Sequence, residues 1–227
     1  MLDFGFYNMD CMQGMKEFPD KYFDLAIVDP PYGINVGTQT MGAGGGVAPL
    51  KSGGGLCISP KIYHPFEDNK TPSAEYFSEL ERVAKNQIIW GGNYYIENLK
   101  NTPCMIVWDK GRRGINFADC ELAWSSFKEP SRIFEFLWNG MLQGDMKNKE
   151  DRIHPTQKPV ALYKWLLSNY AHKGDKILDT HVGSASSLIA CHELGFDYVG
   201  FEIDEVYYEL ATKRLEEAKA QIMWNLE

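Results

Sequence analysis

The stretch DKILDTHVGSASSLIACHELGFDYVGFEID, residues 175–204, decides the fold. It reads as an apolar strand ending in Asp179, a Gly/Ser turn, an apolar helix and a second strand ending in Glu202. Glycine lets the chain turn sharply and lets a ligand approach the backbone, while the first turn of a helix offers unpaired N–H groups. A carboxylate about 20 residues farther on can accept the hydroxyls of a ribose. The stretch therefore predicts a βαβ unit that binds an adenosine-containing cofactor, or a βαβ unit whose glycine serves the turn alone.

The alternation of strand and helix continues through the rest of the chain. Short segments rich in β-branched and aromatic residues predict strands at 4–8, 23–29, 86–92, 104–109, 120–127, 132–138, 175–180 and 197–203. Apolar spacing predicts helices at 73–85, 159–172, 184–194 and 204–222, with Ser73 as an N-cap and Gly174 and Gly195 as helix ends. Near-continuous apolar strands separated by helices are typical of a mostly parallel sheet covered on both faces. We therefore expect an α/β, Rossmann-like, doubly wound domain.

Composition narrows the class of protein. The 227 residues are 44% hydrophobic, enough to bury a core, and no apolar run approaches the roughly 18 residues of a membrane span. The five cysteines are odd in number and form no CxxC pair, so we expect free thiols and a cytoplasmic protein. Cys57 and His64 share one loop, but two ligands do not make a zinc site, so we expect no metal.

The formal charge of −8 argues against nonspecific adhesion to polyanions. It does not exclude a nucleic-acid substrate, because the local footprint matters more than the sum. Basic residues cluster in WDKGRRG, residues 108–114, and in MKNKEDRIHPTQK, residues 146–158. Each cluster fits either a solvated surface or a contact with nucleic acid.

The strand FDLAIVD runs directly into Asp29-Pro30-Pro31-Tyr32. Two consecutive prolines hold the Asp29 carboxylate and the Pro30 carbonyl in a rigid arrangement at the carboxyl end of the strand, where α/β sheets place ligands. Both groups are acceptors, so together they match a donor with two hydrogens, an NH₂ group, and Tyr32 presents a flat face to a ring. Fixed acceptors can localise the lone pair of an aromatic amine, which makes it a better nucleophile. The tetrapeptide thus predicts a site for an exocyclic amine.

Three motifs together carry a family resemblance: DPPY at 29–32, HPTQKP at 154–159, and the strand–turn–helix unit that ends in VGFEID at 199–204. They resemble the S-adenosylmethionine-dependent amino-methyltransferases of DNA. The order, with DPPY first and the cofactor turn last, is that of the circularly permuted β class. The resemblance implies a mixed, mostly parallel, seven-stranded methyltransferase sheet with helices on both faces, in which strand 4–8 lies beside strand 197–203.

The resemblance also implies the site residues. Asp29, Pro30, Pro31 and Tyr32 are the residues that would hold and stack the target base. Those that would bind S-adenosyl-L-methionine are Asp10, Cys11, Asp29, Thr156, Lys158, Asp179, His181, Gly183, Ser184 and Glu202. Within this set, Asp10 would contact the adenine of the cofactor, Glu202 the ribose, and Thr156 and Lys158 the carboxylate end. The sequence departs from the family turn DPFxGSGT at Thr180, His181 and Ala185, which puts the strength of cofactor binding in question.

The function implied is methyl transfer from S-adenosylmethionine to adenine N6 in duplex DNA, on a base flipped out of the helix, as in restriction-modification systems. Cytosine N4 methylation, methylation of RNA and a non-catalytic cofactor-binding regulator remain alternatives. We expect a single domain over 1–227, with a catalytic half at 1–127, a small insertion at 128–153 that is a candidate for target recognition, and a cofactor half at 154–227. The catalytic half contains a glycine-rich loop at 37–72. A homodimer stays open, and a membrane partner is not expected.

Overall fold

The computed structural model describes residues 1–35, 63–66, 68–111, 113, 118–139 and 142–224. Most of the expected loop 37–72 therefore lies outside the described residues, as does Cys57. Within these ranges no helix has the length and apolar character needed to cross a membrane. The same ranges contain no cluster of three or more His, Cys, Asp or Glu side chains placed to hold a metal ion.

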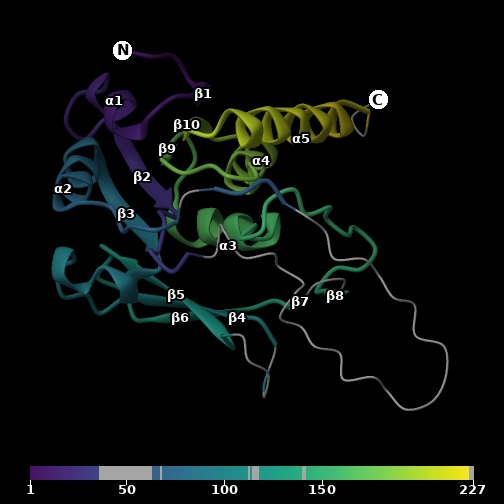
Figure 1. Ribbon diagram of the computed structural model, residues 1–227, viewed down its shortest axis with the longest axis horizontal. Coiled ribbons are helices and arrows are strands. Elements are labelled where there is room, and N and C mark those ends of the chain that lie inside the picture. The colour runs from purple at the N-terminus through teal and green to yellow at the C-terminus, as the bar shows by residue number, and fades with distance from the viewer. Residues whose placement is uncertain (36–62, 67, 112, 114–117, 140–141, 225–227) are drawn as a thin grey trace.

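In the part of the chain that the structure describes, eight strands form one mixed sheet in the order β1-β10-β9-β2-β3-β5-β4-β6 (Figure 1). Their bounds are β1 Gly5–Asn8, β2 Phe23–Val28, β3 Ala84–Trp90, β4 Met105–Asp109, β5 Cys120–Ser125, β6 Arg132–Glu135, β9 Lys176–Asp179 and β10 Asp197–Glu202. The sheet has eight strands instead of the seven that the resemblance implies, because β6 pairs in parallel with β4 at the edge. The mixed, mostly parallel architecture is confirmed.

The pairing of β1 with β10 joins segments from opposite regions of the sequence. Gly5 lies opposite Val199 and Asn8 opposite Glu202 in a parallel register. Strands β1, β10, β9, β2 and β3 all run in the same direction, and β5 is antiparallel to both of its neighbours. The carboxyl ends of the parallel strands therefore meet at one edge of the sheet, which is where ligands bind in folds of this kind.

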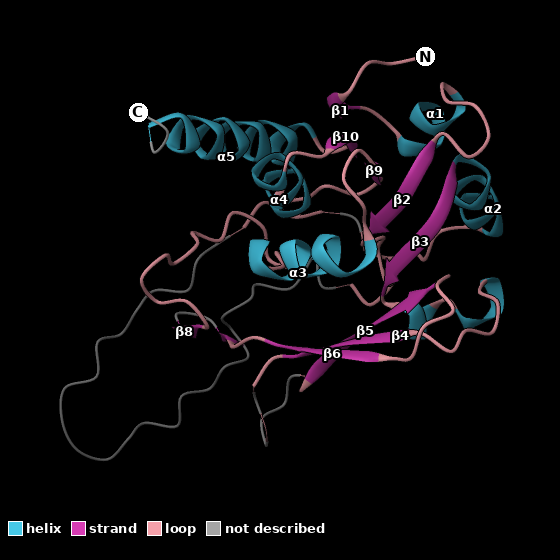
Figure 2. Ribbon diagram, turned by 180° about the vertical axis from the view of Figure 1, so that it is seen from behind, coloured by secondary structure: helices cyan, strands magenta, loops and turns pink. Residues whose placement is uncertain are grey.

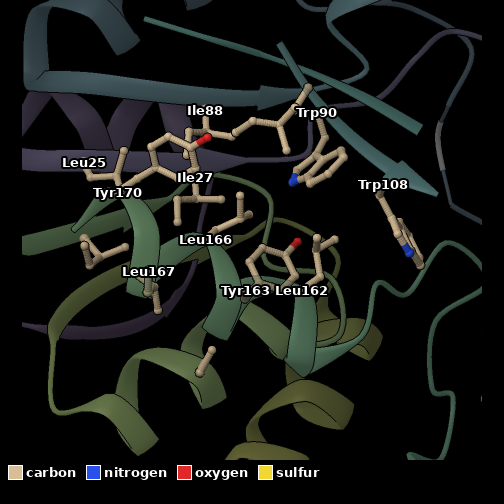
Figure 3. Close-up of a cluster of buried hydrophobic side chains, with 14 of the residues drawn as sticks. Leu25, Ile27, Ile88, Trp90, Trp108, Leu162, Tyr163, Leu166, Leu167 and Tyr170 are labelled. Atoms are coloured by element: carbon tan, nitrogen blue, oxygen red, sulfur yellow. The ribbon is translucent and has the colours of Figure 1, made fainter. Parts of the chain in front are cut away.

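Helices cover both faces of the sheet (Figures 1 and 2). Their bounds are α1 Cys11–Lys16, α2 Ala74–Val83, α3 Val160–Tyr170, α4 Ser186–Leu194 and α5 Glu205–Trp224. Because side chains alternate along a strand, Ala26 and Val28 of β2 pack with α1 and α2, while Leu25 and Ile27 pack with α3 on the opposite face. Figure 3 shows Leu162, Tyr163, Leu166 and Leu167 of α3 directed toward Leu25, Ile27, Ile88 and Trp90 of the sheet. The two-faced core confirms the doubly wound arrangement.

Most element ends follow the sequence, with three differences. Helix α1 is absent from the expected elements, because six residues are too few to show a helical period; Asp10 caps it by accepting a hydrogen bond from Gln13 N at 3.1 Å. Ser73 occupies the N-cap of α2 but makes no side-chain cap. Gly195 ends α4 with φ of 74°, whereas α3 ends at Ala171, before Gly174.

Residues 128–153 contain β6 and a small hairpin, β7 Trp138–Asn139 with β8 Leu142–Gln143. The expected strand 132–138 is thus divided, because the chain leaves the sheet after Glu135 and Gly144 N donates to the Leu137 carbonyl at 2.7 Å. The end of this segment is tied to α5 by an ion pair between Glu150 Oε2 and Arg214 Nη2 at 2.5 Å.

Candidate active site

The DPPY and HPTQKP motifs meet at the carboxyl edge of the sheet. Tyr32 donates its hydroxyl to Asp29 Oδ1 at 2.6 Å. Lys158 Nζ contacts Asp29 Oδ2 at 2.5 Å and the Tyr32 hydroxyl at 3.2 Å, although the two motifs are more than 120 residues apart. The Lys158 side chain is only 3% exposed. The structure therefore places Lys158 against the carboxylate of the amine site, a contact that the sequence did not indicate.

The two proline carbonyls share one partner. Tyr95, which follows β3, donates its hydroxyl to the Pro30 carbonyl at 2.7 Å and to the Pro31 carbonyl at 2.8 Å. A carbonyl oxygen has two lone pairs, so Pro30 keeps acceptor capacity for a ligand. Tyr95 is buried and fixes the backbone of the motif from behind. The sequence offered a signal for it in WGGNYY, residues 90–95, but not the identity of the residue.

The ring of Tyr32 packs against Tyr94 and the backbone of Gly91. Tyr94 stacks on it with 4.9 Å between ring centroids and 16° between planes. Gly91 has φ of 71°, and a Cβ there would lie 2.3 Å from Tyr32 Cε1. The close approach of the Gly91 backbone therefore requires the absence of a side chain. Tyr94 is 43% exposed, so the stack lies at the molecular surface.

Lys158 also pairs with Glu121 of β5, and Glu121 pairs in turn with Lys110. The distance from Lys158 Nζ to Glu121 Oε2 is 3.0 Å, and Lys110 Nζ contacts Glu121 Oε1. Burial raises the pKa of Glu121, but the two lysines outweigh it and bring the pKa to about 2. Burial raises the pKa of Asp29 above its ordinary range despite Lys158. Sequence reasoning missed Glu121 and Lys110.

The second half of the site is the turn between β9 and α4. Gly183, with φ of 56°, donates its N–H to Glu202 Oε2 at 2.8 Å, and Asp204 N donates to Glu202 Oε1 at 2.9 Å. Ser184 Oγ lies 3.1 Å from Ser186 Oγ. Ala185 adopts the left-handed conformation, with φ of 63°, at a position where the family turn has glycine. The predicted turn and the predicted acid at the end of β10 are thus in direct contact.

Asp179 and His181 lie at the start of this turn. Asp179 accepts hydrogen bonds from His181 N at 3.0 Å and from the Ser187 hydroxyl, and burial raises its pKa to about 7. His181 Nδ1 lies 2.9 Å from Thr180 Oγ1, and its ring meets the edge of Tyr76 at 5.5 Å. Burial lowers the pKa of His181 to about 4, so its ring is neutral at pH 7.

The remaining expected cofactor residues border the same region. His154 packs against Tyr207 with 4.2 Å between ring centroids, and Thr156 Oγ1 lies 3.0 Å from His154 Nδ1. A Cβ built at Gly183 would lie 3.9 Å from the His154 ring, so Thr156 stands beside the turn. Cys11 follows the cap residue Asp10, and burial raises the pKa of its thiol to about 12. Of the expected cofactor residues, Asp29 and Lys158 make their hydrogen bonds within the amine site.

Comparison with known proteins agrees with this geometry. Residues 112–213 match the family model described as DNA methylase, N6_N4_Mtase. Type II methyltransferase M.HinfI of Haemophilus influenzae is 24% identical over 92% of this chain and 67% of its own length. M2.MboI of Moraxella bovis is 25% identical over 95% of this chain and 88% of its own length. M.HpaI of Haemophilus parainfluenzae is 39% identical over 38% of this chain, a match that spans 26% of that protein.

Two solved structures share the fold. The complex of M1.HpyAVI with SAM gives a TM-score of 0.53 at 21% identity, covering 92% of this chain and 98% of the other. The PvuII DNA methyltransferase, described as cytosine-N4-specific, gives 0.58 at 11% identity, covering 98% and 93%. These findings confirm the resemblance to the S-adenosylmethionine-dependent DNA amino-methyltransferases. The name of the family model covers both N6 and N4 amines, and one structure with this fold is described as cytosine-N4-specific, so the fold does not select between adenine and cytosine.

Proposed function

We propose that this protein transfers a methyl group from S-adenosylmethionine to the N6 amino group of adenine in DNA. The observation that carries the proposal is the arrangement at the end of β2. The Asp29 carboxylate and the Pro30 carbonyl are fixed acceptors beside the ring of Tyr32, and each keeps an unused lone pair. Two acceptors and a stacking surface match an aromatic amine.

The residues of the turn fit an adenosine-containing sulfonium cofactor. Gly183 has no neighbour within 3.9 Å of the place where a side chain would begin, so a ligand can approach its backbone. Glu202 retains lone pairs for ribose hydroxyls beyond those that it gives to Gly183 and Asp204. Asp179, Ser184 and Thr156 supply further polar groups around the same turn. When bound, the cofactor supplies an electrophilic methyl group.

The residues of the amine site would prepare the nucleophile. Asp29 and Pro30 each accept one hydrogen of the amino group, which draws its nitrogen toward tetrahedral geometry and localises the lone pair. Tyr95 keeps the two proline carbonyls in place through its hydroxyl. The nitrogen loses one proton after attack, to Asp29 or to water. No enzyme nucleophile is required.

The target base must leave the duplex to reach this site, at a cost of a few kcal/mol. Stacking on Tyr32 would offset roughly 1–3 kcal/mol of that cost. The resemblance favours adenine N6, because families with DPPY mostly methylate adenine N6, whereas serine at the first position is commoner for cytosine N4. Cytosine N4 and an RNA amine remain the alternatives for the same pocket.

We also propose which segments contact DNA and how the chain is organised. Residues 128–153 and the loop 37–72 are the candidates for contact with DNA, and most of the loop lies outside the described residues. We further propose one functional domain over 1–227, able to form a homodimer. The cysteines that the structure describes are free thiols, which suits a cytoplasmic enzyme.

The proposal is tested with cofactor carrying a tritiated methyl group. Wild-type protein should label PCR-amplified genomic DNA and not transcribed RNA, whereas Asp29→Ala should lose transfer and still bind the cofactor by calorimetry. Labelling confined to RNA would overturn the choice of substrate. Cofactor binding without any transfer would favour a non-catalytic regulator.

A further inference from the structure

An alternating row of charges leads from Asp29 away from the amine site. Asp29 follows β2, Lys158 precedes α3, Glu121 lies in β5 and Lys110 follows β4. Lys158 Nζ is 2.5 Å from Asp29 Oδ2 and 3.0 Å from Glu121 Oε2, and Lys110 Nζ contacts Glu121 Oε1. Residues at the ends of β2 and β4, in β5 and before α3 thus contribute two carboxylates and two ammonium groups that alternate in sign.

Lys158 is confined at the centre of this row. The Lys158 ammonium donates hydrogen bonds to Asp29 and to the Tyr32 hydroxyl, and it forms an ion pair with Glu121. Its Nζ also lies 5.6 Å from the centroid of the Tyr32 ring and 5.5 Å from that of Trp90. With an exposure of 3%, the Lys158 side chain is enclosed among these groups, beside Asp29.

A buried ion network of this kind is weak support for stability, since desolvation offsets most of the attraction between the charges. Its position indicates another use. An ionised Asp29 accepts a hydrogen bond from an amine more strongly than a protonated one, and burial favours its protonated form. An adjacent cation favours the ionised form of Asp29. A cation paired with Asp29 alone would, however, compete with the substrate amine for the lone pairs of the carboxylate.

We propose that Glu121 is a positioning residue that holds the ammonium of Lys158 between two carboxylates. In this place Lys158 keeps Asp29 ionised with one hydrogen bond and leaves the remaining acceptor capacity to the substrate amine. Lys110 compensates the charge of Glu121 on its outer side. The inference rests on the proposed function, because it concerns the group that would bind the amine.

Other ionisable groups near the row also act on the titration of Asp29. Those that face Asp29, Lys158 or Glu121 are Tyr32, Tyr95, Lys110, His154, Tyr163 and Asp179. Burial lowers the pKa of His154 to about 3, so His154 is neutral at pH 7. The principal charges that act on Asp29 at pH 7 are therefore those of Lys158 and Glu121, and their removal should shift its titration in opposite directions.

The direct test follows the side-chain carboxyl carbon of Asp29 by NMR, assigned by comparison with Asp29→Asn. Lys158→Met should raise the pH at which Asp29 titrates by roughly 1–3 pH units, the effect of one adjacent opposite charge. Glu121→Gln, of nearly the same shape, should lower it, and the double variant should fall between the two. Lys85→Met, which removes a lysine paired with Asp24 and 55% exposed, is the control and should leave Asp29 unchanged.

The rate of methyl transfer to PCR-amplified genomic DNA should be measured against pH. The acid limb of this profile should move in the same directions as the titration of Asp29, so that Lys158→Met recovers activity at alkaline pH. A purely structural role would instead lower the rate equally at every pH. Unchanged titration of Asp29 in Glu121→Gln, or a shift upward, would overturn the inference, and this variant decides it if Lys158→Met does not fold. If the variants shift the titration of Asp29 as expected but the wild type transfers no methyl group to DNA, the proposed function is refuted and the role of Glu121 is confirmed.

Discussion

At the scale of the residue, Gly91 determines where Tyr32 lies. Alanine at this position would place a Cβ 2.3 Å from Tyr32 Cε1 and would have to adopt φ of 71°. We predict that Gly91→Ala displaces the Tyr32 ring and slows methyl transfer about a hundredfold, the effect of a misplacement of about 1 Å. Cofactor binding, measured by calorimetry, should be retained because the turn at Gly183 is not touched.

Gly195→Ala provides the matched control for this substitution. Gly195 has nearly the same backbone conformation, with φ of 74°, but nothing lies within 4 Å of a Cβ built there. This variant should lose about 1–2 kcal/mol of unfolding free energy from the left-handed conformation and keep its activity. Equal losses of activity in both variants would show that the contact with Tyr32 does not matter.

His181 is a second residue whose effect can be isolated, since the family turn has phenylalanine in its place. Its pKa is about 4 in the folded protein, below the ordinary value of about 6.5 in the unfolded chain. Between these values the unfolded state binds more protons, so the histidine contributes stability above pH 6.5 that is lost as the pH falls toward 4. We predict that His181→Phe reduces the loss of unfolding free energy between pH 7 and pH 5 by about 1–2 kcal/mol.

The measurement is urea unfolding at the two pH values. Only the difference between them matters, so any change in packing caused by the phenylalanine cancels. His172→Phe, at a site where the side chain is 91% exposed, should show the wild-type difference. The same difference in His181→Phe would contradict the account of the buried ring.

At the scale of the element, the end of the insertion 128–153 is fixed to helix α5. Arg214 donates to the Ser184 carbonyl at 2.6 Å and pairs with Glu150 at 2.5 Å, and Glu150 Oε1 accepts from Val160 N at 2.9 Å. Breaking this pair from one side should cost about 3–5 kcal/mol, because Glu150 would remain buried without its counterion. We therefore predict a loss of this size for Arg214→Met in urea unfolding.

The double variant Arg214→Met with Glu150→Gln removes the orphaned charge and keeps an acceptor for Val160 N. It should recover most of the loss, which would identify the uncompensated carboxylate as its cause. If the single and double variants lose the same unfolding free energy, packing of the arginine and not charge holds these elements together.

The elements themselves were largely predictable from the sequence. Long strands such as β2 and β3 show their apolar runs, and α3 shows its helical period, because both patterns depend on neighbours in sequence. Helix α1 was missed for lack of length, and the division of 132–138 between β6 and the β7–β8 hairpin depends on backbone contacts with Asp109 and Gly144. Boundaries set by such distant partners leave no local pattern.

At the scale of the whole molecule, the parallel strands bring motifs from both halves of the chain to one edge of the sheet. Asp29, Asp179 and Glu202 were predictable because each lies at the carboxyl end of a recognisable strand. Glu121 and Tyr95 were not, since each acts through a contact formed between strands or turns far apart in the sequence. Lys158 was expected at the cofactor, whereas its hydrogen bonds lie with Asp29 and Tyr32. The sequence therefore indicated both parts of the candidate site but not the ion pairs that surround Lys158.

The central claim, that the Asp29 site methylates adenine at N6, is tested most directly by identifying the product. Unmethylated genomic DNA is treated with the protein and S-adenosylmethionine, digested to nucleosides and analysed by mass spectrometry, with Asp29→Ala treated in parallel. We predict N6-methyldeoxyadenosine in the wild-type sample and none with Asp29→Ala. N4-methyldeoxycytidine as the product, or equal methylation by both proteins, would contradict it.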